Sequence, residues 1–169
     1  NTPQQIENHN KWVAVACGAS HTIAIASDGS LWGWGNNNLG QLGDGTLIDK
    51  IKPIQIGNDL NWKTVACGGS HTESIKNDGT LWAWGWNYNG RLGDGTTFSK
   101  SSPFRIGNDE DWKSLACGSD YTIALKNNNT LWSWGYSDNG QLGNGKRTIF
   151  EYPTQIDNNE NWASISCSR

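Results

Sequence analysis

The sequence lacks methionine altogether, and none of its apolar runs approaches the roughly 18–20 residues that a membrane-spanning helix needs. It also lacks an excess of basic charge, because 13 Lys and Arg stand against 16 Asp and Glu, giving a formal net charge of -3. These absences argue against a membrane protein and against binding to nucleic acid through bulk charge. A chain of this length normally folds as one domain, which we expect to comprise residues 1–169.

Signatures of catalysis and of metal binding are missing as well. The Gly-rich run at residues 40–46 lacks the Gly-Lys-Ser/Thr ending of a phosphate-binding loop. Asp44 and Asp94 lack the dense oxygen ligands of a Ca²⁺ site, so turn chemistry explains them better. His21 and His71 have no carboxylate or nucleophile at a shared spacing, which favours a structural hydrogen-bonding role over general-base catalysis. We therefore expect no enzyme, no metal and no cofactor.

What the sequence has in abundance is tryptophan (11) and glycine (21), a composition that favours an all-β protein. One proline, one tryptophan and one cysteine recur in register every 50 residues, and a fixed period of this size indicates a propeller or a solenoid. Equivalent cysteines one unit apart are usually too distant for a disulfide, so we expect four small buried thiols. The recurring positions are Pro3, Pro53, Pro103 and Pro153; Trp12, Trp62, Trp112 and Trp162; and Cys17, Cys67, Cys117 and Cys167.

One unit has room for four short strands but not for a long helix. We predict strands over residues 53–56, 62–67, 71–75 and 81–85, followed by a Gly-rich loop over about 86–102. Four antiparallel strands make one propeller blade, here beginning with the strand after the proline. Trp82 and Trp84 have counterparts in every unit, which favours core packing over stacking on sugars or bases. Alternation in the second strand places Trp62, Thr64 and Ala66 on one face and Val65 and Cys67 on the other.

The motifs of the unit carry a resemblance to a known family. In the first unit they are Ala16-Cys17-Gly18-x-Ser20-His21-Thr22, Asp28-Gly29, Leu31-Trp32-x-Trp34-Gly35-x-Asn37 and Gly40-Gln41-Leu42-Gly43-Asp44-Gly45. Recurring nearly throughout the chain, this signature resembles the RCC1 (regulator of chromosome condensation) repeat family, whose members typically form seven-bladed propellers. The third unit departs from it at turn positions, where Tyr121, Asn129 and Asn144 replace His, Gly and Asp.

The repeats are too few for such a ring. Counting the expected strands gives fourteen, or about three and a half blades, in units 12–61, 62–111 and 112–161 with half-blade overhangs at 1–11 and 162–169. An open arc of blades leaves sheet faces uncovered and edges unpaired. Either the chain is a fragment of a longer propeller, or further copies of it complete the ring. Our hypothesis is self-association into a closed ring.

The parity of the strands divides the loops between two faces. Because strands reverse at every turn, the turns at 57–59 and 77–79 share one face, which collects acidic residues. The Cys-Gly-x-Ser-His turn and the long loop share the other, which collects basic and aromatic residues that differ from unit to unit. Such side chains either fold over the blade edges or bind a partner, as variable aromatic loop residues often do. The candidate binding residues are Ile48, Lys50, Trp86, Tyr88, Phe98, Lys100, Tyr136, Arg147 and Phe150.

The favoured function is a non-catalytic protein-binding scaffold, because the loops vary while the blade does not. The resemblance also implies nucleotide exchange on a Ran-like small GTPase, but the family uses a β-hairpin wedge for which the uniform 50-residue spacing leaves no insertion. A lectin-like carbohydrate binder using Trp86 and the tyrosines is the other alternative. The sequence assigns no compartment: unpaired cysteines favour a reducing interior, whereas Asn-rich Trp-Gly repeats are also similar to those of bacterial surface or secreted proteins.

Overall fold

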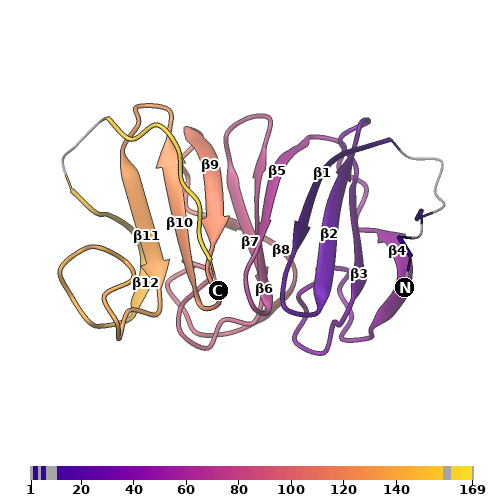
Figure 1. Cartoon of the computed structure of the whole chain (residues 1–169), viewed down its shortest axis with the longest axis horizontal. Coiled ribbons are helices and arrows are strands. Elements are labelled where there is room, and N and C mark those ends of the chain that lie inside the picture. Colours follow the sequence, from indigo (N-terminus) through magenta and orange to yellow (C-terminus); the bar gives the residue numbers. More distant parts are fainter. Residues whose placement is uncertain (1, 4, 7–10, 158–160, 169) are drawn as a thin grey trace.

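The computed structural model describes residues 2–3, 5–6, 11–157 and 161–168, which form three four-stranded antiparallel sheets standing side by side (Figure 1). Each sheet keeps the order of the chain. This described part contains no helix, and hence none that could cross a membrane. The expected all-β architecture of propeller blades is confirmed. The strands are β1 (Trp12–Cys17), β2 (His21–Ala26), β3 (Leu31–Gly35) and β4 (Lys50–Gln55); β5 (Trp62–Cys67), β6 (His71–Lys76), β7 (Leu81–Gly85) and β8 (Lys100–Ile106); and β9 (Trp112–Cys117), β10 (Tyr121–Lys126), β11 (Leu131–Gly135) and β12 (Phe150–Gln155).

The strand that carries the proline ends a blade and does not begin one. Pro53 lies in β4, which pairs with β3 across the long loop at residues 36–49. The prediction that this strand begins the next blade was therefore wrong. The short connection at 56–61 has the length of a hairpin, but it crosses from the last strand of one sheet to the first strand of the next.

The blades meet along their first strands. Strand β5 lies against β1 and β2, and β9 lies against β5 and β6, so the first strands form the inner side of the arc. The fourth strands lie at the opposite edge of each sheet. The blades therefore converge on their inner strands and diverge toward their outer strands, which is the wedge arrangement of a propeller.

The hydrophobic core lies between the sheets. Ile25 and Leu31 of the first blade pack against Trp62 and Trp84 of the second. The second blade packs on the third in the same way, against Trp112 and Trp134. The side chains of Trp84 and Trp134 are fully buried, which confirms that these tryptophans serve the core.

A β-bulge near the start of each first strand changes which residues share a face. In β5 the pairing with β6 shifts between Trp62 and Thr64. Trp62 consequently packs in the same cluster as Val65 and Cys67, and the predicted alternation for this strand was wrong. One extra residue in a strand reverses the side-chain parity beyond it.

The first blade has one uncovered face, because no blade precedes it among the described residues. We call the face with the first-strand tryptophan the leading face; in the second and third blades the preceding blade covers it. On the first blade it is uncovered, so that Val15 is 65% exposed whereas its counterpart Val65 is partly buried. Cys17 is exposed for the same reason, and Cys67, Cys117 and Cys167 are half-buried, which corrects the expectation of four buried thiols; no disulfide links the four.

The two outermost predicted strands are not seen. Residues 161–168 are described but form no strand, because no described strand follows to pair with them. The predicted strand after Pro3 falls partly on residues outside the described ranges. Among the described residues, twelve of the fourteen expected strands are therefore present.

Glycines let the long loop of one blade press against the next blade. Gly93 has φ +72°, and a Cβ there would lie 2.8 Å from Nε1 of Trp134. Gly43 makes the corresponding approach to Trp84, with φ +81°. Only glycine combines this backbone conformation with such close contact to a buried indole.

We predict that Gly93→Ala lowers the free energy of unfolding by about 3 kcal/mol, since an unfavourable positive φ and an overpacked indole act together. The matched control is Gly107→Ala in the same blade, where φ is +62° and no atom lies within 4 Å of the added methyl group. That variant should lose only about 1 kcal/mol. Urea unfolding measures both, and equal losses would contradict the packing argument.

Candidate functional site

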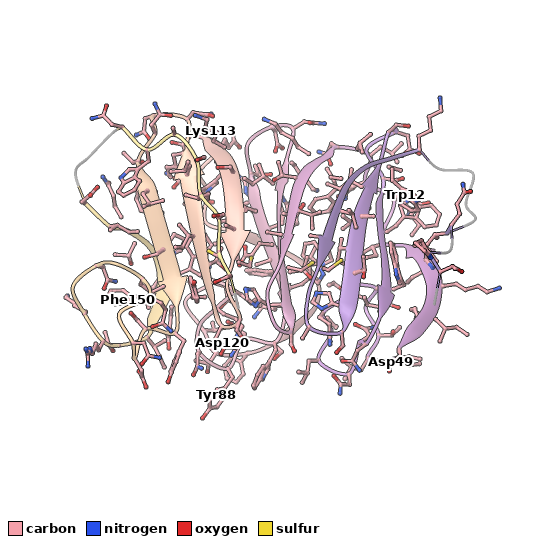
Figure 2. The ribbon with its side chains drawn as sticks, viewed as in Figure 1. Trp12, Asp49, Tyr88, Lys113, Asp120 and Phe150 are labelled. Atoms are coloured by element: carbon pink, nitrogen blue, oxygen red, sulfur yellow. The ribbon has the colours of Figure 1, made fainter. Side chains whose placement is uncertain are left out.

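The long loops and the Cys-Gly turns lie at one end of the blades, which we call the loop face: residues 36–49, 86–99 and 136–149 with the turns 18–20, 68–70 and 118–120. The backbone N–H of Asn36 donates to the carbonyl of Ser20, and that of Tyr136 donates to the carbonyl of Asp120. The turns at 57–59 and 77–79 lie at the other end. Figure 2 shows Tyr88 and Asp120 at the loop face and Lys113 at the opposite end. The predicted division into two faces is confirmed for these segments.

Each of the first two long loops is folded around one buried asparagine. Nδ2 of Asn37 donates to Oδ1 of Asp44 over 2.9 Å and to the carbonyl of Thr46 over 3.0 Å. Its Oδ1 accepts the backbone N–H of Leu42 over 2.9 Å. Asn87 makes the same bonds in the second loop. These residues, which the first two units share, therefore shape both loops and leave the remaining positions free to vary.

The candidate lysines take part in this loop framework. Nζ of Lys50 lies 2.8 Å from Asp44, and Nζ of Lys100 lies 2.7 Å from Asp94. Burial alone would raise the pKa of Asp44, but hydrogen bonds from Lys50 and Thr46 outweigh it and lower that pKa. In the third unit both partners change together, to Asn144 and Phe150. The two lysines are thus neutralised within their own loops.

An aromatic cluster lies where the loops of the second and third blades meet. Trp86 and Tyr88 stack with ring centroids 5.8 Å apart and an interplanar angle of 19°. Tyr88 is 66% exposed. The Arg91 guanidinium lies 4.3 Å from the Trp86 ring centroid, and its Nη1 lies 2.5 Å from Oδ1 of Asp120. An ion pair between two blades, with Arg91 buried and Asp120 half-exposed, therefore supports an aromatic pair in which Tyr88 is the exposed ring.

Sequence reasoning missed Arg91 and Asp120. Arg91 stands where the other units have Gln41 and Gln141, and Asp120 stands where they have Ser20 and Ser70. The two departures are complementary in charge and meet across the junction. Paired departures from the repeat are the signal that could have found this contact.

The other candidates spread along the loop face. Ile48 is 67% and Phe98 is 75% exposed, and Arg147 is also exposed. Tyr136 donates its hydroxyl to Asp138 over 2.8 Å. Phe150 is half-buried and packs against the core between the second and third blades. The structure thus brings Trp86, Tyr88 and Tyr136 to one junction. That the nine candidate residues bind a partner remains a prediction.

A buried polar network lies between the blades. Nε2 of His21 lies 3.1 Å from Oγ1 of Thr72, and Nε2 of His71 lies 3.3 Å from Oγ1 of Thr122. Burial lowers the pKa of His71 well below its usual value, so the ring is neutral at pH 7. The expected structural role of these histidines is confirmed.

Two of the four thiols are held in their protonated form. Burial raises the pKa of Cys117 well above its usual value, and burial also raises that of Cys167. The thiolate, which is the reactive and metal-binding form, is thereby disfavoured. Within the described ranges, no group of three or more His, Cys, Asp and Glu residues is arranged to hold a metal ion.

Glu73 is a fully buried carboxyl where the other units have Ile23 and Ile123. Its Oε1 accepts a 3.4 Å hydrogen bond from Thr122, while Oε2 is buried without a hydrogen-bond partner. Burial raises the pKa of Glu73 well above its usual value, although Trp134 and Thr122 partly oppose the shift. The protonated form is therefore favoured in the folded protein.

We predict that Glu73→Ile raises the free energy of unfolding at pH 7 by about 1–3 kcal/mol, because it removes an unsatisfied buried polar group. The unfolded chain releases the Glu73 proton first, so the parent protein loses stability as the pH rises above about 4.3 and through the folded-state pKa. Glu73→Gln should lack this loss while keeping a polar side chain. The free energy of unfolding of all three proteins is measured in urea between pH 4 and 8. His71 contributes equally to each protein, so a difference in pH dependence reports on Glu73. Parallel stability curves would contradict the prediction.

Taken together, stacked antiparallel blades with a wedge-shaped junction define a repeat protein of the β-propeller class. The regulator of chromosome condensation (RCC1) repeat matches residues 28–74, 78–125 and 128–169. A second description of the same repeat matches residues 12–41, 62–91 and 112–141. The chain belongs to the RCC1 repeat family.

Curated relatives match over short stretches. The ultraviolet-B receptor UVR8 of Arabidopsis thaliana is 45% identical over 40 residues, which are 24% of this chain and 9% of that protein. Human protein RCC2 is 41% identical over 51 residues, or 29% of this chain and 10% of that protein. The matched stretches are thus a small part of each relative's length.

Solved structures match over nearly the whole chain. Yeast RCC1 (Prp20), in its complex with Kap60, superposes with a TM-score of 0.83 at 22% identity, covering 96% of this chain and 41% of that chain. Human WBSCR16 gives 0.80 at 24% identity, covering 90% and 42%. Prp20p of Saccharomyces cerevisiae, described with its binding to Gsp1p and histones, gives 0.75 at 27% identity, covering 88% and 39%. The chain spans about two fifths of each of these propellers.

Proposed function

We propose that the chain is a non-catalytic, protein-binding propeller scaffold whose partner docks on the loop face, at the junction of the second and third blades. The observation that carries this proposal is the stacked Trp86–Tyr88 pair, in which Trp86 is half-buried and Tyr88 is exposed, held in place by Arg91 and Asp120. Aromatic and arginine side chains dominate the binding energy of protein interfaces. Here Trp86, Tyr88 and Arg91 stand at positions that differ among the three units. Tyr88 is exposed to a partner, whereas the buried Arg91 supports the Trp86 ring.

The relatives support a binding role over a catalytic one. Yeast RCC1 is known in a complex with Kap60, and Prp20p is described by its binding to Gsp1p and histones. Those partners belong to those proteins, and they provide purified candidates for this chain. The partner of this chain is identified by chemistry: a protein with an apolar pocket for the Tyr88 ring and polar groups around it.

We predict that Tyr88→Ala and Phe98→Ala weaken partner binding by about 2 kcal/mol or more at a hot-spot position, which is roughly thirtyfold. Both side chains are exposed, so their removal leaves the fold intact. Lys113→Ala, at the opposite end of the blades, is the matched control (Figure 2). Partners are captured by cross-linking to the chain and identified by quantitative mass spectrometry. Each captured protein, and also Gsp1p and histones, is then titrated against the parent chain and the variants to measure its affinity. Binding that falls equally for the control would contradict the proposed face.

Ring completion by a second copy is part of the same proposal. The leading face of the first blade is apolar and uncovered, with Val15 65% exposed and Cys17 exposed beside it. The same face of the second and third blades is covered by the preceding blade, which shows the kind of surface that fits it. The third blade of another copy offers that surface. Residues 161–168 would then have to move, because Cys167 lies beside Tyr121 of the third blade, where the incoming first strand would pack.

We predict that the 169-residue chain self-associates and that Val15→Asp makes it monomeric, because a charge cannot be buried in this apolar contact. Phe98→Asp introduces the same charge at an exposed position of the loop face and should leave the association unchanged. Light scattering during size-exclusion chromatography gives the mass. A monomeric parent protein would rule out self-association without touching the loop-face proposal.

A further inference from the structure

The outer rim holds two related hollows, one at each junction between blades. The hollow between the first and second blades has a volume of about 300 Å³, and that between the second and third has about 400 Å³. They open because the blades diverge toward their outer strands. Their shared frame consists of repeat-equivalent residues: Gly43 and Gly93, Asp44 and Asp94, Ile56 and Ile106, Asp59 and Asp109, Trp62 and Trp112, Trp82 and Trp132, and Pro103 and Pro153.

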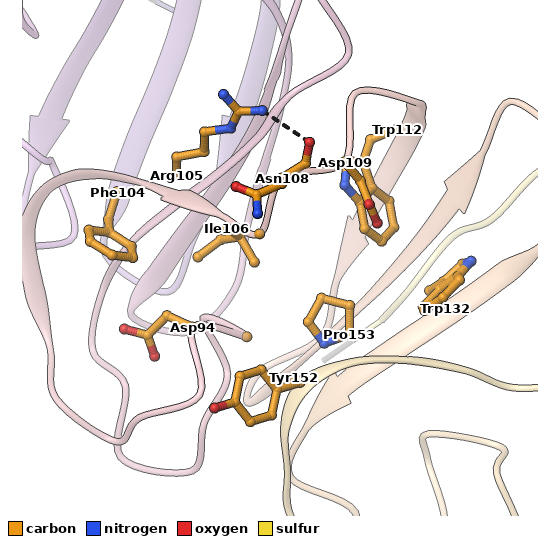
Figure 3. A pocket seen from close by; sticks show the side chains of 12 residues that line it. Asp94, Phe104, Arg105, Ile106, Asn108, Asp109, Trp112, Trp132, Tyr152 and Pro153 are labelled. Carbon is orange, nitrogen blue, oxygen red and sulfur yellow. Dashed lines mark hydrogen bonds between the residues drawn. The ribbon is translucent and has the colours of Figure 1, made fainter.

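The second hollow, which we call the rim groove, differs from the first in its walls. Tyr152 lines it where the first hollow has Ser102, and Phe104 lines it where the first blade has Ile54. Tyr152 is 63% and Phe104 is 47% exposed. Figure 3 shows these two rings from β12 and β8 at the groove, together with Pro153 and Trp132. The rim groove therefore has exposed aromatic walls on a frame that the other junction shares.

Charged groups in the rim groove already have partners within the protein. Asp94 pairs with Lys100 over 2.7 Å, Asp109 pairs with Lys126 over 2.6 Å, and Arg105 pairs with Glu110 over 3.1 Å. An ionic ligand would have to displace one of these pairs. The groove is therefore matched to an uncharged ligand that has apolar faces and hydrogen-bonding groups.

The polar groups lie together at one end of the groove. Nη2 of Arg105 donates to the carbonyl of Asn108 over 3.2 Å, drawn as a dashed line in Figure 3. The side chains of Asn108 and Asp109 line the same end. The Arg105 guanidinium and the Asp109 carboxylate are held by their ion pairs, and the Asn108 amide is exposed beside them. Together these groups can donate to and accept from several hydroxyls.

We propose that the rim groove binds a neutral saccharide. The apolar C–H face of a pyranose ring would lie against Tyr152 or Phe104, and its hydroxyls would bond to Asn108, Asp109 and Arg105. The volume of about 400 Å³ lies at the lower end of the range of about 300–1,000 Å³ for small-molecule sites, which suits a short oligosaccharide. The site lies on the outer rim and does not depend on the loop-face proposal.

The test compares the two junctions of the same protein. The 169-residue chain is screened on an array of neutral glycans, and the bound glycans are titrated by saturation-transfer NMR. The double variant Tyr152→Ser with Phe104→Ile gives the rim groove the residues of the first junction. Binding of at least one neutral glycan is expected, and the variant should weaken it at least about tenfold, the effect of losing aromatic contact. Tyr88→Ala, on the loop face, should bind the glycan like the parent chain.

Three results would overturn the proposal. The first is the absence of any neutral glycan signal from a chain that unfolds cooperatively. The second is glycan binding that the double variant leaves unchanged, which would place the saccharide elsewhere. The third is capture of a proline-rich peptide, used as a competing probe, by the groove in place of a glycan. A protein partner lost only in Tyr88→Ala would still support the loop face, so the two proposals fail separately.

Discussion

The packing of tryptophans from one blade onto the aliphatic face of the preceding blade is the constraint on which the rest of the structure depends. A single four-stranded sheet has two faces and cannot bury either alone. Trp84 and Trp134 provide the largest fully buried side chains of the junctions. Nε1 of Trp84 also donates to the carbonyl of Gln41 over 3.0 Å, which ties the indole to the loop of the preceding blade. The tryptophans that pack on a neighbouring blade are therefore the same in every unit, and exposed loop positions are left to differ.

Much of the fold followed from the period, and the errors have physical causes. The 50-residue spacing and the glycine turns predicted the strands and the two faces. Pairing across a long loop cannot be read from connection length, so the proline strand was assigned to the wrong blade. The bulge after Trp62 inserts one extra residue into the strand, and the alternation of apolar and polar residues in the sequence does not reveal it.

The candidate sites were only partly readable for a related reason. Exposed aromatics at variable loop positions, such as Tyr88, could be found because the repeat supplies its own comparison. The Arg91–Asp120 pair joins residues 29 positions apart, which only the docking of two blades brings together. Tyr152 and Phe104 belong to the fourth strands of different blades, and their approach follows from the wedge geometry. Sites made by two blades need the structure, whereas sites within one loop do not.

One of the two descriptions of the RCC1 repeat is out of phase with the blade: residues 28–74 cover β3 and β4 of one sheet, and β5 and most of β6 of the next. The first two matches, residues 28–74 and 78–125, thus contain the covalent link between two neighbouring sheets. Duplication or deletion of one 50-residue length of the gene, at whatever point it begins, adds or removes a complete blade and recreates the same seam on both sides. A lineage built in this way can change the size of its arc in single genetic steps, without any new contact having to arise first.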